Sequence, residues 1–161
     1  MIDNPLLSFD IIQVGLSLIE NMVAKKMHIT HKNLLILVLP IISIYSIDSK
    51  IFAFLSVNSP EKVQNIIRKK KFLKMILKIF KDVVESAASL TEIDIQICAH
   101  LLHTTAKLTY HNKKNQDYMI KKKGYEYIKG VIATSQDLNL LQGAICTFAN
   151  LSETSNLIVK F

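Results

Sequence analysis

The residues best able to bind a metal in this sequence are a cysteine and two histidines within six positions, Cys98, His100 and His103. Thiolate and imidazole groups are the ligands of structural zinc sites, which need four of them in a tetrahedron. On a helix, Cys98 and His100 point about 200° apart, because successive residues turn by about 100°. No second group of cysteines or histidines completes the set. We therefore expect no metal ion, and no other cofactor, in this protein.

The sequence supports acid–base or nucleophilic catalysis no better than it supports a metal site. The sequence contains no glycine-rich phosphate loop, no nucleophile elbow and no His-Glu-x-x-His motif. Asp82 and Glu85 would share one face of a helix, but two acids at that spacing are typical of a solvated surface. We predict that the protein is not an enzyme.

Lysine provides the main functional signal of the composition. The chain has 20 lysines and arginines against 13 acids, for a net charge of +7. On a helix, the lysines from position 68 to 81 form a stripe opposite an apolar face. The stripe is Lys71, Lys74, Lys78 and Lys81. An AT-rich genome also enriches lysine. The stripe can therefore be a solvated helix face without a partner, or a surface that binds an acidic protein, nucleic acid or an anionic membrane.

The elements that must position these residues are predicted to be helices. A chain of 161 residues with 50% apolar residues can bury a sizeable core. Four glycines and three prolines are too few for the many turns of a β-sandwich or barrel. Apolar spacing and caps predict an all-α protein with helices over residues 8–26, 30–47, 60–84 (one helix or two), 91–108, 115–123, 125–133 and 138–151.

The location of the protein is predicted to be intracellular. Residues 1–10 lack the basic region of a secretory signal. The uncharged run 33–47 is short for a membrane span and contains Pro40, which favours a buried core helix. Cys98 and Cys146 lie in apolar runs typical of buried free thiols in a reducing compartment. We expect the protein to be in the cytoplasm, with the nucleus and the cilium as alternative locations.

An internal repeat organises the second half of the chain. Residues 64–76 align with residues 116–128 without a gap, with five identities in thirteen positions. The segments that follow end in Ala106-Lys-Leu-Thr109 and Ala149-Asn-Leu-Ser152, 43 residues apart. That distance is typical of helical solenoid repeats, which recur every ~40–47 residues.

Residues 115–152 resemble an armadillo repeat. The most specific part is residues 141–152, Leu-Gln-Gly-Ala-Ile-Cys-Thr-Phe-Ala-Asn-Leu-Ser, which is similar to the family's Ala-x-x-x-Leu-x-Asn-Leu ending. Gly124 would end the repeat's short first helix. The divergent copy has Phe72 where the family has this glycine and Lys107 where it has the asparagine. The resemblance implies a right-handed α-solenoid of about three armadillo-like repeats, formed as one domain from residues 8–48, 59–110 and 113–152, with 153–161 starting a further repeat.

The same resemblance implies a non-enzymatic interaction module. Third helices of such repeats line a concave groove that holds an extended peptide, here residues 92–108 and 138–151. The expected contacts are Asn150, Lys107, Gln142 and Thr147, with the lysine stripe. Cys146 stands where importin-alpha-like repeats have tryptophan, so an acidic partner, similar to those of beta-catenin, is favoured over a nuclear-localisation peptide. An open C-terminal end would also allow self-association. The alternative is a basic adaptor that binds nucleic acid or a membrane through residues 68–81.

Overall fold

A computed structural model describes residues 5–45, 60–69, 71–85 and 90–154, and the regular structure in these ranges is entirely helical. The prediction of an all-α protein is confirmed. The helices are α1 (Pro5–Ala24), α2 (Met27–Thr30), α3 (Lys32–Tyr45), α5 (Pro60–Lys69), α6 (Phe72–Glu85), α7 (Glu92–Thr109), α8 (Lys113–Lys121), α9 (Gly124–Thr134) and α10 (Leu138–Ser152). The predicted positions 46–48, 59 and 155–161 lie outside the described residues.

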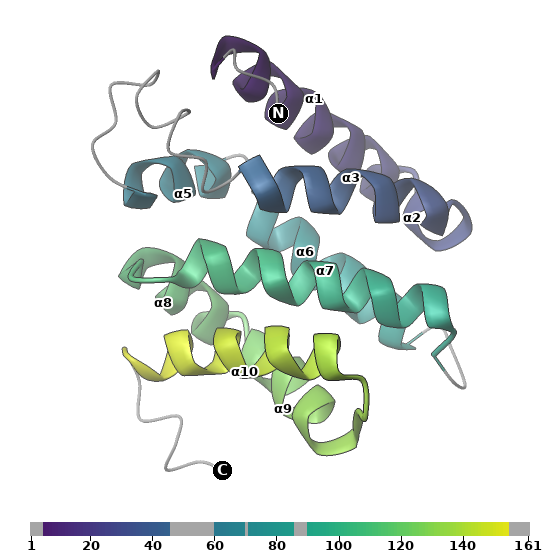
Figure 1. Cartoon of the computed structure of the whole chain (residues 1–161), viewed down its shortest axis with the longest axis vertical. Coiled ribbons are helices and arrows are strands. Elements are labelled where there is room, and N and C mark those ends of the chain that lie inside the picture. The colour runs from purple at the N-terminus through teal and green to yellow at the C-terminus, as the bar shows by residue number, and fades with distance from the viewer. Residues whose placement is uncertain (1–4, 46–59, 70, 86–89, 155–161) are drawn as a thin grey trace.

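Three long helices, α3, α7 and α10, lie side by side in one layer (Figure 1). Helix α7 is in the middle and packs on both neighbours, most extensively on α10. Behind this layer α1 packs on α3, α6 on α7 and α9 on α10, and α6 also contacts both α1 and α9. The core lies between the two rows of helices, where side chains such as Ile19, Leu39, Ile79 and Leu101 are fully buried.

The predicted starts of α5, α7 and α10 are confirmed by their geometry. Pro60 is the first residue of α5, where its missing N–H is not needed. Thr91 caps α7 by accepting a hydrogen bond from the Asp94 N–H at 3.3 Å. Asp137 caps α10 in the same way, through the Leu140 N–H at 2.8 Å.

Three lysines make the same turn at three helix junctions. Lys26, Lys71 and Lys123 have left-handed backbones with φ of 58°, 61° and 57°. Each donates its N–H to the carbonyl three residues earlier, on Val23, Arg68 and Ile120 respectively. The aligned pair Lys71 and Lys123 therefore adopts one conformation in both copies of the sequence repeat.

Gly124 does not end the helix before it, as the sequence suggested. Lys123 takes the left-handed conformation and Gly124 is the first residue of α9. A Cβ at this position would lie 2.6 Å from Met119 Cε and 3.0 Å from Leu77 Cδ2, so the ends of these two side chains would have to move to make room for it. The short helix α8 also begins earlier than predicted, at Lys113, after the Asn112 cap.

The apolar run around Pro40 forms α3, which continues through the proline. Its residues Leu35, Leu39 and Ile42 are fully buried at helical spacing. Within the described ranges, none of the helices combines the length and the apolarity needed to cross a bilayer.

The two cysteines have different environments. Cys98 is buried in α7, where burial and the nearby Asp94 charge raise the pKa of the thiol to about 12. Cys146 is exposed on α10, so the expectation of two buried thiols was wrong for this residue. The apolar run around Cys146 covers more than one helix face, and the buried positions of α10 follow the face of Ala144, Thr147 and Leu151.

Gly143 sets the close approach of α10 to α7. A Cβ at this position would lie 3.0 Å from Leu102 Cβ and 3.1 Å from the backbone nitrogen of His103. Because a backbone atom cannot move aside without shifting α7, we expect Gly143→Ala to lower the free energy of unfolding by about 1–3 kcal/mol. Urea denaturation followed by circular dichroism measures this change.

Gly130 in α9 is the matched control for that substitution. A Cβ at this position meets no atom within 4 Å. Gly130→Ala is expected to stabilise the protein by about 0.5–1 kcal/mol, because alanine loses less conformational freedom in a helix. Equal stabilisation by both substitutions would contradict the close contact at Gly143.

Candidate functional site

Three of the four predicted stripe lysines line one groove between α1 and α6. Lys71, Lys74 and Lys78 lie along one side of it, and all three are exposed. The groove has a volume of about 260 Å³ and its other lining residues are Glu20, Val23, Ala24 and Met75. The apolar face of α6 is buried in the core, so these lysines are directed away from the core.

The charge of the groove is unbalanced. Among the described residues, no carboxylate lies within 4.0 Å of the ammonium groups of Lys71, Lys74 or Lys78. Glu20 lines the groove and forms no ion pair of that length with another described residue. Lys81, the fourth predicted residue, is not among the lining residues and pairs with Glu85 at 3.8 Å within α6. Within the described part of the chain, the groove therefore carries three positive charges without an ion-pair partner beside one negative charge.

A buried histidine fixes the position of α6 beside this groove. His28 in α2 is fully buried, and its Nε2 lies 2.7 Å from Asp82 Oδ2 in α6. Its Nδ1 lies 3.3 Å from the carbonyl oxygen of Met22 in α1. The pair thus joins the end of α1 to α6. The sequence pattern grouped Asp82 with Glu85 and gave no sign of the pair with His28, because the partners are 54 positions apart.

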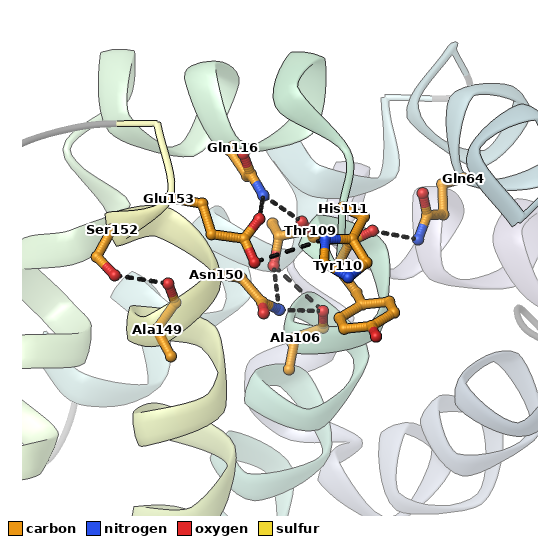
Figure 2. A network of polar contacts seen from close by, with 10 residues as sticks. All are labelled: Gln64, Ala106, Thr109, Tyr110, His111, Gln116, Ala149, Asn150, Ser152 and Glu153. Carbon is orange, nitrogen blue, oxygen red and sulfur yellow. Dashed lines mark hydrogen bonds and ion pairs between the residues drawn. The ribbon is translucent and has the colours of Figure 1, made fainter.

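Two of the predicted peptide contacts take part in packing between α7 and α10. Thr147 is fully buried and its hydroxyl donates to the carbonyl oxygens of Leu102 at 3.0 Å and Gly143 at 2.8 Å. The Asn150 side-chain amide donates to the Ala106 carbonyl oxygen at 2.7 Å (Figure 2). Both side chains are therefore used within the protein.

The other two predicted contacts are Gln142 and Lys107. Gln142 is exposed on α10. Lys107 is half-buried in the last turn of α7, and burial lowers the pKa of its ammonium group. Of this set, Gln142 is thus the exposed side chain, Lys107 and Asn150 are half-buried, and Thr147 is buried.

Side-chain amides hydrogen-bond to five successive carbonyl groups at the end of α7. We call Gln64, Asn115, Gln116 and Asn150 the amide cluster. Asn150 donates to Ala106, Gln64 to Lys107 and Tyr110, Asn115 to Leu108, and Gln116 to Thr109, at 2.6–3.1 Å. A helix end leaves such carbonyl groups without partners inside the helix. The cluster provides partners for these carbonyl groups, of which Ala106 also accepts the Tyr110 N–H and Thr109 the Asn112 N–H, and it joins α5, α8 and α10 to one point.

Further contacts hold the amide cluster in place. Asn112, fully buried, donates to Gln64 Oε1 at 2.9 Å. Gln116 also donates to Glu153 Oε2 at 2.8 Å, and Glu153 lies 3.6 Å from His111 (Figure 2). The sequence analysis aligned Gln64 with Gln116, but it assigned neither residue a role. That alignment was the available signal for this network.

A buried ion pair joins α3 to α7. The Lys32 Nζ lies 2.6 Å from Oδ1 of Asp94, which is fully buried. Asp94 Oδ2 also accepts hydrogen bonds from the Thr91 hydroxyl at 2.6 Å and the Thr91 N–H at 3.1 Å. Burial acts to raise the pKa of Asp94, but the hydrogen bonds from Lys32 and Thr91 outweigh it, so the pKa lies below its ordinary value of 3.8.

This lowered pKa predicts a loss of stability in acid. Well above pH 3.8 the Asp94 carboxylate is ionised in both folded and unfolded protein, and its full contribution to stability is present. As the pH falls below 3.8, the unfolded chain binds a proton first, so the contribution is lost as the pH approaches the lower pKa of the folded state. Urea midpoints measured between pH 7 and pH 2 should show this decline. The decline should be smaller in Lys32→Met, and an equal decline in both proteins would contradict the role of Lys32.

The three residues considered for metal binding differ in burial. Cys98 is buried, whereas His100 and His103 are half-buried on α7. Burial and the neighbouring His103 lower the pKa of His100. In the part of the chain that the structure describes, no three side chains of the metal-ligating types gather at one point.

Comparisons with known proteins give no match, whether with family models, curated proteins or solved structures.

Proposed function

We propose that the protein is a non-enzymatic interaction module that binds an acidic segment of a partner protein in the groove between α1 and α6. The observation that carries the proposal is the set of three exposed lysines, Lys71, Lys74 and Lys78, which line one groove without an ion-pair partner among the described residues. A bound segment with several carboxylates would supply the missing charges.

The composition of the groove favours a protein over a polyphosphate. Its floor contains Val23, Ala24 and Met75, which can pack against apolar side chains. Lysine also lacks the planar fork with which arginine grips phosphates.

The arrangement of the helices supports, as part of the same proposal, a right-handed solenoid of about three armadillo-like units. The order of a short helix, an amphipathic helix and a long central-layer helix occurs in α5–α6–α7 and again in α8–α9–α10. Helices α3, α7 and α10 would be the third helices of these units. Thr147 is buried and Asn150 is hydrogen-bonded to Ala106, so both side chains are already used between α7 and α10. We therefore favour the α1–α6 groove over the α7–α10 face as the binding surface. We propose that this interaction takes place inside the cell, most plainly in the cytoplasm.

Binding of a fluorescent decaglutamate peptide tests the proposal. Fluorescence anisotropy at about 150 mM salt would compare the protein with a variant carrying Lys71→Glu, Lys74→Glu and Lys78→Glu. The control variant, Lys113→Glu, Lys114→Glu and Lys121→Glu, makes the same charge change on exposed positions of α8. We expect the groove variant to bind at least tenfold more weakly and the control variant to bind within about threefold of the unmodified protein.

Two further probes give the result that would overturn the proposal. They are a labelled single-stranded DNA of twenty thymidines and vesicles that contain phosphatidylserine. Tighter binding of either probe than of decaglutamate would favour the basic adaptor for nucleic acid or membrane. Equal losses in the groove and control variants would assign the binding to net charge alone. Circular dichroism confirms that each variant is folded.

A further inference from the structure

We infer that the partner segment is an amphipathic helix with acidic residues at i, i+3 and i+7 along one edge and an apolar strip beside them. The inference rests on the proposed function, because it names the kind of acidic segment that the α1–α6 groove would take. Three features carry it: the spacing of the lysines, the shape of the groove and the distribution of charge across it.

The spacing of the lysines matches a helix better than an extended chain. Lys71, Lys74 and Lys78 are separated by steps of three and four residues. The Lys71 carbonyl oxygen accepts the Met75 N–H at 3.1 Å, so Lys71, although its own backbone is left-handed, lies directly at the first turn of α6. At 1.5 Å per residue the outer two lysines are about 10.5 Å apart along the axis. Acids at i, i+3 and i+7 on a second helix have this same spacing, whereas three same-side residues of a strand span about 13 Å.

The shape of the groove fits side chains of a helix. It is formed by two helices, and its floor of Val23, Ala24 and Met75 is apolar. Its volume of about 260 Å³ is below the ~300–1,000 Å³ of small-molecule pockets, but large enough for an apolar side chain. Seating apolar side chains between two helices is the way in which amphipathic helices are bound by grooves.

The charges of the groove are asymmetric and set the orientation of the bound helix. The lysines belong to the α6 side, and Glu20 belongs to the α1 side. A complementary helix therefore carries its acids toward α6, its apolar strip over the floor and a basic residue toward Glu20. This pattern distinguishes it from a uniformly acidic segment.

Three labelled peptides test the inference by fluorescence anisotropy. The first is an amphipathic helix with glutamates at i, i+3 and i+7, leucines along the adjacent strip and one lysine on the opposite edge. The second has the same composition in an order that places the glutamates on all faces. The third is decaglutamate. We expect the first peptide to bind at least tenfold more tightly than the second, and its helical circular dichroism to increase when it binds.

Variants of the groove give two independent checks. Ala24 is exposed at the end of α1, so Ala24→Trp fills the floor without changing a charge. Ala24→Trp should weaken the binding of the first peptide, the patterned helix, about tenfold and leave the affinity for decaglutamate within about twofold. Ala133→Trp, at an exposed position of α9, is the control and should change neither affinity. Glu20→Lys should weaken the first peptide and strengthen a version with glutamate in place of its lysine.

The outcomes separate this inference from the proposed function. If decaglutamate binds the groove and the patterned helix binds no better than its reordered control, the inference is overturned while the proposed function stands. If neither the helix nor decaglutamate binds, both are overturned. Tighter binding of the patterned helix that Ala24→Trp abolishes supports both.

Discussion

Replacing Asp94 with alanine is expected to lower the free energy of unfolding by about 3–5 kcal/mol, which is the typical cost of removing one partner from a buried ion pair. The Asp94 carboxylate is fully buried, lies 2.6 Å from Lys32 Nζ and accepts two hydrogen bonds from Thr91. Its loss removes the link between α3 and α7 and half of the capping box of α7. Typical proteins are stable by only ~5–15 kcal/mol, so much of the stability would be lost.

Two conservative variants separate the cap from the charge. Asp94→Asn keeps a side-chain oxygen for the Thr91 N–H but removes the negative charge opposite Lys32. Lys32→Met removes the positive charge and keeps the capping box intact. A double-mutant cycle of Lys32→Met with Asp94→Asn, followed by urea denaturation, gives the coupling energy of the pair. A coupling energy near zero would show that the cap, and not the ion pair, carries the effect of Asp94.

Replacing Asn115 with aspartate is expected to cost at least about 3 kcal/mol at pH 7, because it buries a charged acceptor opposite another acceptor. Asn115 is fully buried, and its amide donates to the Leu108 carbonyl oxygen at 2.6 Å. Its own Oδ1 is buried without a hydrogen-bond partner in the structure. The substitution preserves the size of the side chain, so the loss measures the missing donor at the end of α7.

The same substitution has a pH signature that a packing defect lacks. Acidification protonates the new carboxyl group, and its O–H can then donate to the Leu108 carbonyl oxygen. The difference in unfolding free energy between Asn115→Asp and the unmodified protein should therefore shrink between pH 7 and pH 4. Asn139→Asp, at an exposed position in the first turn of α10, is the matched control and should be neutral or slightly stabilising there. A pH-independent loss at Asn115 would contradict the donor role.

The helical class and several helix starts could be predicted from the sequence, because the forces that decide them act over a few residues. The Thr91 and Asp137 caps each involve a side chain and a backbone N–H three positions later. The amphipathic pattern of α6 likewise placed Lys71, Lys74 and Lys78 on the exposed side before their neighbours were known. Helix periodicity and capping are local properties, and the sequence states them directly.

The pattern within a single helix did not reveal which element lies opposite the lysines or which buried polar groups form pairs. The α1–α6 groove exists because α1 packs beside α6, and that neighbour relation also brings His28 to Asp82 across 54 positions. The burial of Thr147, the exposure of Cys146 and the use of Asn150 at Ala106 likewise follow from the packing of α10 on α7.

The sequence by itself therefore determined the helical class, the approximate extent of most helices and which helix faces carry lysines, whereas the separate short helix α2 was not predicted. The tertiary structure alone decided which polar side chains are used inside the protein and which ones line a groove. The physical reason is that a buried donor or charge must be paired wherever the chain brings a partner to it, and that partner is set by long-range packing. Local pattern fixes the direction of a side chain on its helix, whereas its partner depends on the helix that packs against that face.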